Sequence, residues 1–263
     1  MMDFQSTEKK SQTESKSILP GGVVGILGGG QLGRMLAIAA RRMGYSVHAY
    51  EPQQDCPAGQ ICDLEVNAPY TDPTALKKFA NGVDVVSFEF ENIPRSAIET
   101  VSEIRPVHPR GEVLHICQNR EREKTFLHSN GFPCAPFRVI DSAASLAEAL
   151  QEIGTPSVLK TADFGYDGKG QIKLEAGADA NDVWKRFGAP RGVLEKWISF
   201  RAELSVVSAR GTDGKTVSFP VSENQHEHHI LDLSIVPARF SAEVLESATR
   251  LAAHITEALD VVG

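Results

Sequence analysis

A glycine turn between an apolar run and a helical pattern constrains the fold of this chain more than any other feature. Residues 22–27 have the apolar character of a buried parallel strand, and glycines occupy positions 28–30 directly after it. From Gln31 to Met43, apolar residues recur at helical spacing. A strand that enters a helix through a tight glycine turn predicts the first unit of an α/β sheet.

The same alternation continues over the first 110 residues. Strand patterns cover 46–50 and 83–88. Between them, Asp72-Pro73 offers an N-cap followed by proline at the first position of a helix that reaches about Ala80. This alternation predicts a parallel, doubly wound sheet in a Rossmann-like domain over residues 20–110. The polar residues 1–19 predict a disordered tail.

The second half of the chain has a different pattern, which predicts an α+β domain over residues 111–263. Helical stretches are expected at 110–131, 142–153 and 241–259, and strands at 192–197, 201–210, 215–220 and 232–237. Asp213-Gly214 lies between two of these strands, and Asp-Gly is typical of a hairpin turn.

Charge and composition exclude several classes of protein. The net charge of −7 argues against a nucleic acid or an anionic membrane as partner. No apolar run reaches the length of a membrane-spanning helix, and the first residues lack the apolar core of a signal peptide. The four cysteines form no C-x-x-C pair, which predicts reduced thiols in a cytoplasmic protein.

A second glycine segment carries the clearest chemical signal. A short apolar run places Lys160 at the end of a strand, and Lys169 lies in the following loop among glycines at 165, 168 and 170. Glycine lets backbone N–H groups approach phosphate oxygens, and the lysines supply countercharge. The spacing is not that of an ordinary P-loop. The pattern therefore predicts a polyphosphate site, with a solvated hairpin loop as the alternative.

The first glycine turn admits a different function. Residues 28–33 fit G-x-G-x-x-G, and Glu51 follows the second strand, where a dinucleotide-binding enzyme holds ribose. This pattern favours an NAD-dependent dehydrogenase. However, any first strand–helix turn of such a sheet favours glycine, and a dinucleotide enzyme needs no second phosphate loop.

Several motifs together resemble one family over residues 22–263. They are Gly-Ile-Leu-Gly-Gly-Gly-Gln-Leu-Gly-Arg-Met at 25–35, Phe-Glu-Phe-Glu-Asn at 88–92, Leu-Lys-Thr at 159–161, Gly-Tyr-Asp-Gly-Lys-Gly-Gln at 165–171, the stretch from Glu195 to Glu203, and Glu-Asn-Gln-His at 223–226. This series resembles the N5-carboxyaminoimidazole ribonucleotide synthetases, which are ATP-grasp enzymes of purine biosynthesis. The resemblance implies a Rossmann-like pre-ATP-grasp domain followed by an ATP-grasp domain.

The resemblance also implies two binding sites. The turn residues Gly30, Gln31 and Leu32, with Glu89 close by, would face 5-aminoimidazole ribonucleotide. The residues implied for ATP are Arg120, Lys160, Gly165, Tyr166, Asp167, Gly168, Lys169, Gly170, Gln171, Glu195, Lys196, Trp197, Ile198, Glu203 and His226. Among them, Tyr166 and Asp167 would also meet the ribonucleotide and, with Lys160, act in catalysis.

The implied reaction is an ATP-dependent C–N ligation. ATP would activate bicarbonate as carboxyphosphate, and the exocyclic amine of 5-aminoimidazole ribonucleotide would capture the carboxyl group. Phosphoryl transfer mainly requires positioning and charge neutralisation, which lysine, arginine and Mg²⁺ provide. No nucleophilic side chain is needed. The family also implies a possible homodimer.

Two departures from the family pattern bear on activity. Asp163-Phe164 stands where many relatives have Arg-Gly or Thr-Gly. Family members also continue past the position of Gly263, into a segment with magnesium-binding acids and basic residues for the ribonucleotide phosphate. We therefore expect no metal ligands within this truncated ATP-grasp domain, an incomplete last sheet, and weak or no activity.

Two other functions stay open at this point. One is a different ATP-grasp carboxylase or ligase, and the other is a non-catalytic nucleotide-binding protein. The histidines at 226, 228 and 229 lie in a loop-like stretch without helical spacing, so we predict no metal site there.

Overall fold

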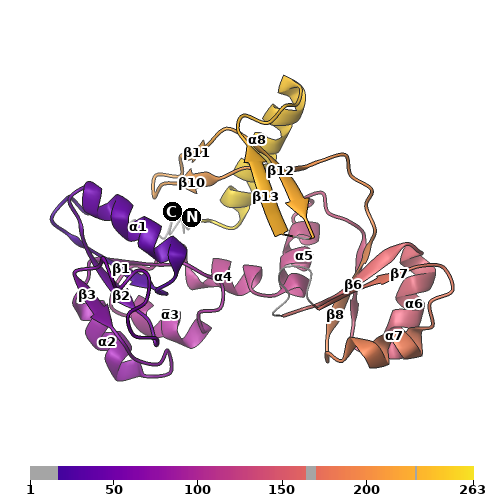
Figure 1. The fold of residues 1–263 in the computed structure, drawn as a ribbon, viewed down its shortest axis with the longest axis horizontal. Coiled ribbons are helices and arrows are strands. Elements are labelled where there is room, and N and C mark those ends of the chain that lie inside the picture. Colours follow the sequence, from indigo (N-terminus) through magenta and orange to yellow (C-terminus); the bar gives the residue numbers. More distant parts are fainter. Residues whose placement is uncertain (1–16, 164–169, 229) are drawn as a thin grey trace, which may run out of the picture.

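The computed structural model describes residues 17–163, 170–228 and 230–263. Figure 1 shows two larger groups of elements at opposite ends, two short helices between them, and a third group of strands with one long helix above those helices. Of the tail predicted at 1–19, only 17–19 belong to the described residues.

The first sheet is parallel, as predicted. It consists of β1 (Val23–Leu27), β2 (Ser46–Tyr50), β3 (Leu64–Val66) and β4 (Val85–Phe88), in the order β3-β2-β1-β4. Its helices are α1 (Gln31–Arg42), α2 (Pro73–Asn81) and α3 (Arg95–Ser102). The sequence patterns did not predict β3, which has three residues, or α3, which follows Pro94 without a side-chain cap.

Helices cover both faces of this sheet because neighbouring residues of β1 point in opposite directions. Ile26 packs with the buried alanines of α1, whereas Leu27 packs with α2 and α3. Asp72 caps α2 by accepting hydrogen bonds from the amides of its first turn, as expected. A Cβ at Gly25 would lie 2.9 Å from the ring of Phe79, so glycine lets α2 pack closely.

Two helices link the first sheet to the next. The pattern at 110–131 predicts helix, and the structure forms α4 (Gly111–Cys117) and α5 (Arg120–Ser129) there. Asn119 separates them, because its side chain accepts a hydrogen bond from the amide of Arg122 and caps α5.

The second sheet is antiparallel. It contains β5 (Phe137–Ile140), β6 (Ser157–Thr161), β7 (Gln171–Leu174) and β8 (Gly192–Lys196), in the order β5-β8-β6-β7. Helices α6 (Ala143–Ile153) and α7 (Ala180–Phe187) share one apolar core with it. The second glycine segment thus joins the paired strands β6 and β7, and the predicted helix at 142–153 is confirmed, with Ser142 as its N-cap.

In the third group of elements, the strands differ from those predicted. Its sheet has the order β13-β12-β9, formed by β9 (Glu203–Ser205), β12 (Ser222–Glu227) and β13 (Ile230–Ile235). A separate hairpin pairs β10 (Ser208–Arg210) with β11 (Thr216–Ser218). The single strand predicted at 201–210 was wrong, because this stretch divides between two sheets. The loop predicted around His226 was also wrong, because that residue lies in β12.

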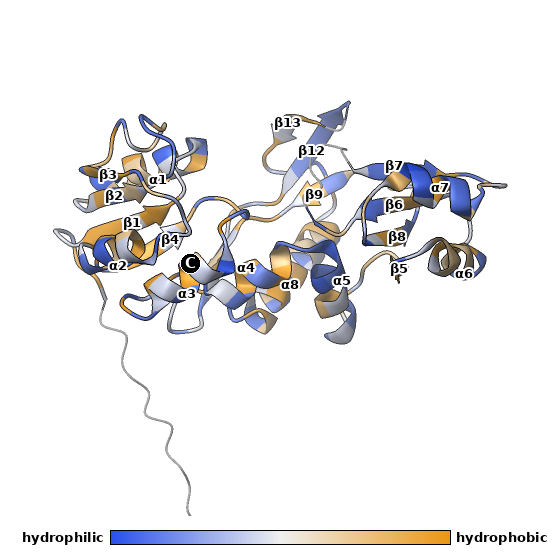
Figure 2. Cartoon of the chain, turned by 90° about the horizontal axis from the view of Figure 1, so that it is seen from below, coloured by the Kyte–Doolittle hydropathy of each residue, from blue (hydrophilic) through white to orange (hydrophobic). Residues whose placement is uncertain are grey.

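The last helix, α8 (Ala242–Ala258), agrees with the prediction of a helix from Ser241 to about Leu259. It has no buried residue, and most of β13 is exposed. Figure 2 shows apolar residues along α8. None of the helices formed by the described residues is long and apolar enough to span a membrane.

Candidate functional site

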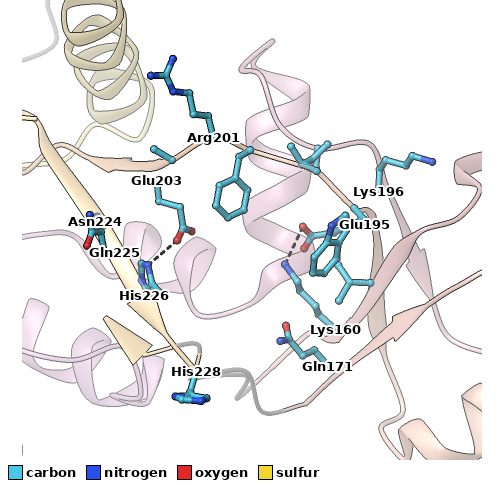
Figure 3. Close-up of a pocket in the computed structure, with 16 residues that line it drawn as sticks. Lys160, Gln171, Glu195, Lys196, Arg201, Glu203, Asn224, Gln225, His226 and His228 are labelled. Carbon is cyan, nitrogen blue, oxygen red and sulfur yellow. Dashed lines mark hydrogen bonds and ion pairs between the residues drawn. The ribbon is translucent and has the colours of Figure 1, made fainter. Parts of the chain in front are cut away.

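A pocket of about 930 Å³ lies between the second sheet and strands β9 and β12 (Figure 3). Its lining includes many of the residues implied for ATP. These are Lys160, Gln171, Glu195, Lys196, Trp197, Ile198, Glu203 and His226. Residues more than 60 positions apart in the chain therefore meet in one cavity.

One wall of this pocket contains the buried carboxylate of Glu195, and three cations surround that carboxylate. The side chain of Glu195 is 7% exposed, and its Oε2 lies 3.2 Å from Nζ of Lys160 and 3.1 Å from Nζ of Lys124. Nε of Arg120 lies 3.7 Å from Oε1 of the same carboxylate. Glu123 lies near the same cations, but burial raises the pKa of its carboxyl above the ordinary value. The three cations therefore outnumber the carboxylates here, which suits an anionic ligand.

Helix α5 brings Arg120 to this wall. The Arg120 guanidinium donates a hydrogen bond of 2.7 Å to the carbonyl of Thr161, and its backbone N–H donates to the carbonyl of Ala162. Arg120 and Lys124 are one helical turn apart, so both reach β6 and β8 from the same face of α5. Both side chains therefore face Glu195 and are largely shielded from solvent.

Asp163, one of the departures from the family pattern, is held by a neutral partner. The side-chain amide of Asn119 donates a hydrogen bond of 2.7 Å to its carboxylate. The same Asn119 side chain caps α5. The extra acid therefore helps to fix the end of β6 to the start of α5.

The segment that follows β8 forms the apolar part of the pocket. Trp197 is 39% exposed, and Nζ of Lys173 lies 4.6 Å from the centre of its ring. Ile198 and Phe200 are also exposed in the pocket lining. Among the hydrogen bonds of the described residues, none uses the backbone N–H of Ile198. An apolar slot beside a vacant backbone donor suits a flat heteroaromatic ring.

Lys196 directs its side chain away from the pocket, as Figure 3 shows. Its Nζ donates hydrogen bonds to the carbonyls of Ile153 (3.2 Å) and Thr155 (3.5 Å) at the end of α6. A cation at the C-terminus of a helix offsets the partial negative charge there. The lysine side chain therefore stabilises the end of α6.

Across the pocket, Glu203 and His226 form a pair. Nδ1 of His226 lies 2.7 Å from Oε2 of Glu203. The two residues come from the neighbouring antiparallel strands β9 and β12. This pairing holds both side chains in the pocket lining, where they can meet polar groups of a ligand.

The first glycine turn is a separate site, and carboxylates occupy its backbone donors. The N–H groups of Gly30 and Gly33 donate to Glu89 at 2.7 and 3.1 Å, and that of Gly29 donates to Glu51 at 2.9 Å. These N–H groups are therefore not available to phosphate oxygens. A turn with two carboxylates favours a ligand with N–H donors.

The structure brings the implied ribonucleotide residues together at this turn. Glu89 bonds the turn itself, and Gln31 and Leu32 are exposed at the first turn of α1, where Leu32 is 62% exposed. The turn and the pocket on the second sheet lie in different groups of elements.

Part of the second glycine segment lies outside the described residues. This applies to Gly165, Tyr166, Asp167, Gly168 and Lys169. Gly170 is described, has a positive φ of 69°, and accepts a hydrogen bond from the amide of Thr161 through its carbonyl. A Cβ at this position would lie 2.7 Å from Oγ1 of Thr161, so glycine is required where the segment re-enters β7.

Sequence reasoning missed several residues of the pocket. The lining residues missed are Phe200, Arg201, Asn224, Gln225 and His228, and Lys124 was missed as a partner of Glu195. The spacing from Arg120 was the available signal for Lys124. For Asn224 and Gln225, the signal was the Glu-Asn-Gln-His motif at 223–226, from which only His226 was taken as a site residue.

The described residues do not fit a divalent-cation site. They contain no group of three or more His, Cys, Asp or Glu side chains that could hold a metal ion. The two acids of the pocket already have partners, since Glu195 faces cations and Glu203 bonds His226.

Comparisons with known proteins match both halves of the chain. A family model described as a ribonucleotide synthetase preATP-grasp domain matches residues 22–118, and an ATP-grasp domain model matches residues 125–263. The chain is 40% identical over 250 residues to the N5-carboxyaminoimidazole ribonucleotide synthase of Bacillus subtilis, covering 95% of this chain and 66% of the relative. It is 42% identical over 253 residues to the Brucella melitensis enzyme, covering 95% and 70%.

Solved structures agree. An ADP complex of an N5-carboxyaminoimidazole ribonucleotide synthetase matches with a TM-score of 0.90 at 40% identity, covering 95% of this chain and 66% of that one. The Aspergillus clavatus enzyme in complex with ADP and 5-aminoimidazole ribonucleotide matches with a TM-score of 0.83 at 29% identity, covering 92% and 64%. The chain spans about two thirds of the length of the curated relatives reported above. These matches confirm the resemblance found in the motifs, and the chain belongs to the N5-carboxyaminoimidazole ribonucleotide synthase family of ATP-grasp proteins.

Proposed function

We propose that this protein carboxylates 5-aminoimidazole ribonucleotide with bicarbonate, using ATP, to give N5-carboxyaminoimidazole ribonucleotide. The observation that carries the proposal is the convergence of Lys160, Arg120 and Lys124 on Glu195 beside a pocket with an apolar slot. Family membership gives this arrangement its ligand, because related structures hold ADP.

In the proposed binding mode, ATP lies in the pocket on the second sheet. Its adenine occupies the slot by Trp197 and Ile198, and its ribose meets Glu203, with His226 near the nucleotide. Its phosphates lie toward Lys160 and Arg120, which neutralise charge as the γ-phosphoryl group is transferred to bicarbonate. The residues 165–169 complete this proposal as the cover of the phosphates, with Tyr166 and Asp167 meeting both substrates.

The ribonucleotide site is proposed at the first glycine turn. The related Aspergillus clavatus structure holds ADP and 5-aminoimidazole ribonucleotide together. In this chain, the carboxylates of Glu89 and Glu51 at the turn supply acceptors for the N–H donors of an aminoimidazole. Gln31 and Leu32 lie at the same turn.

The carboxylation proceeds in two steps. A bicarbonate oxygen attacks the γ-phosphorus of ATP, which releases ADP and gives carboxyphosphate. The exocyclic amine then attacks the carboxyl carbon, phosphate leaves, and the amine loses a proton. ATP is proposed to bind as its Mg²⁺ complex, in a homodimeric protein of the cytoplasm. The cytoplasmic location is supported by the free state of Cys56, Cys62, Cys117 and Cys134.

Two measurements test this function. Calorimetry of the 263-residue chain is expected to show saturable binding of ADP, and failure to bind ADP would remove the proposed pocket. Phosphate release from ATP, Mg²⁺ and bicarbonate is then measured with and without 5-aminoimidazole ribonucleotide, and we expect a weak release that depends on the ribonucleotide. Because the described residues lack a divalent-cation site, ADP binding without any such release would favour a non-catalytic nucleotide-binding protein.

A further inference from the structure

The three cations at Glu195 are placed unequally. Lys160 extends from β6 and lines the pocket, whereas Lys124 reaches the carboxylate from α5 with a side chain that is only 16% exposed. Both lysines contact the same oxygen, Oε2. The other oxygen, Oε1, is buried and has no hydrogen-bond partner among the described residues.

Once a nucleotide binds, its phosphates and the Glu195 carboxylate compete for the same cations. This step rests on the proposed function. The phosphates attract Lys160 and Arg120, which also neutralise Glu195. A carboxylate this deeply buried is strongly destabilised when its partners leave. Lys160 can therefore turn to a phosphate only if another cation stays with Glu195.

We propose that Lys124 is a positioning residue, which keeps Glu195 paired while Lys160 and Arg120 turn to the nucleotide phosphates. At 3.1 Å from Oε2, Lys124 already makes the contact that must remain. Without it, Glu195 retains Lys160, and the fraction of molecules competent to bind phosphate falls. The apparent affinity for ADP falls in proportion to this fraction. If about one molecule in ten is competent, the affinity falls about tenfold.

The first test compares ADP with adenosine, because adenosine lacks the phosphates that draw Lys160 away. Dissociation constants are measured by calorimetry for the wild-type chain, Lys124→Met, Lys124→Arg and Lys185→Met. Lys185 is exposed on α7, so its variant controls for the loss of one positive charge. We expect Lys124→Met to weaken ADP binding about tenfold and to change adenosine binding less than about twofold. Lys124→Arg and Lys185→Met are expected to resemble the wild type.

Equal losses for ADP and adenosine in Lys124→Met would show a merely structural role, and unchanged ADP binding would show no role. Either result overturns the proposal.

A second test removes the buried charge and does not depend on the folding of Lys124→Met alone. In a Glu195→Gln background, the neutral side chain needs no cation, so adding Lys124→Met is expected to leave the ADP affinity within about twofold. A tenfold loss in this background would mean that Lys124 itself contacts phosphate, which contradicts the proposal.

The wild-type measurement distinguishes failure of the proposed function from failure of the inference about Lys124. If the wild-type chain binds neither ADP nor adenosine, the proposed function fails and this inference fails with it. If the wild type binds ADP and the ratio of ADP to adenosine affinity is the same in Lys124→Met, only the inference about Lys124 fails.

Discussion

The chain contains two glycine-rich segments that follow strands, and the structure gives them opposite electrostatic surroundings. At the first, Glu51 and Glu89 accept hydrogen bonds from the N–H groups of the turn. At the second, Lys160 lies near the end of the strand that precedes the glycines. It contacts Glu195, as do Arg120 and Lys124. Similar glycine content therefore serves a turn lined by acids and a pocket lined by bases.

The difference shows why a glycine pattern alone does not identify a phosphate site. Glycine makes backbone N–H groups accessible, but the neighbouring side chains decide which ligand reaches them. In the first turn, Glu51 bonds Gly29, so it does not extend to a ribose as in a dinucleotide-binding enzyme. Substitutions in and around the two segments can test this contrast.

The largest effect is expected from Lys160→Met. The substitution removes the cation that lines the pocket and leaves Glu195 to Lys124 and Arg120. Loss of a charge-assisted contact to phosphate is expected to weaken ADP binding by about 2 kcal/mol, or about 30-fold. Calorimetry with ADP and adenosine checks this, with Lys185→Met as the control. Unchanged ADP affinity would contradict the proposal that the cations around Glu195 bind the phosphates.

The acidic turn is expected to respond in stability. Glu89→Ala removes the acceptor of the Gly30 and Gly33 amides, and two unpaired donors are expected to lower the free energy of unfolding by about 2 kcal/mol. Urea denaturation measures this, with the exposed Glu91→Ala as the matched control. ADP affinity is expected to stay unchanged. A large loss of ADP binding would mean that the two glycine segments are not separate sites.

A smaller effect is expected from Lys196→Met, which tests whether this lysine binds phosphate together with the cations around Glu195. Because its ammonium group bonds the last carbonyls of α6, its loss is expected to lower the free energy of unfolding by about 0.5–1 kcal/mol. ADP affinity is expected to stay within about twofold of the wild type. Thermal unfolding and calorimetry check both values, and a tenfold loss of ADP binding would place this lysine at the phosphates.

The smallest effect concerns the pair that ties α5 to the segment before β8. The Arg191 guanidinium, whose Nη2 lies 2.7 Å from Oε1 of Glu121, lowers the pKa of that carboxyl below its ordinary value of 4.5. A lowered pKa in the folded state adds stability above pH 4.5, and this is lost as the pH falls through the lowered value.

Glu121→Gln is therefore expected to lower the free energy of unfolding by less than about 1 kcal/mol at neutral pH. The difference from the wild type is expected to vanish in acid. Urea denaturation of both proteins, from neutral pH to below the ordinary carboxyl pKa of 4.5, measures this difference. A difference that persists well below pH 4.5 would contradict the role given to the ionised pair.

Much of the fold could be predicted from local sequence. The first strands, the cap at Asp72, the helix after Ser142 and the hairpin at Asp213-Gly214 are set by neighbours in the chain. The polar strand β12 could not be predicted, because only its pairing with β9 and β13 makes it a strand.

Local sequence was enough to place most of the longer helices and buried strands, the two glycine segments and the family. These depend on residue spacing and local propensity, which are readable along the chain. The hydrogen bonds from the first turn to Glu89, and the sharing of Glu195 by Lys124 and Lys160, arise only when the chain is folded. Such contacts join residues 35 or more positions apart, and a charge acquires its role only when folding places its partner within a few ångströms in a site that excludes water.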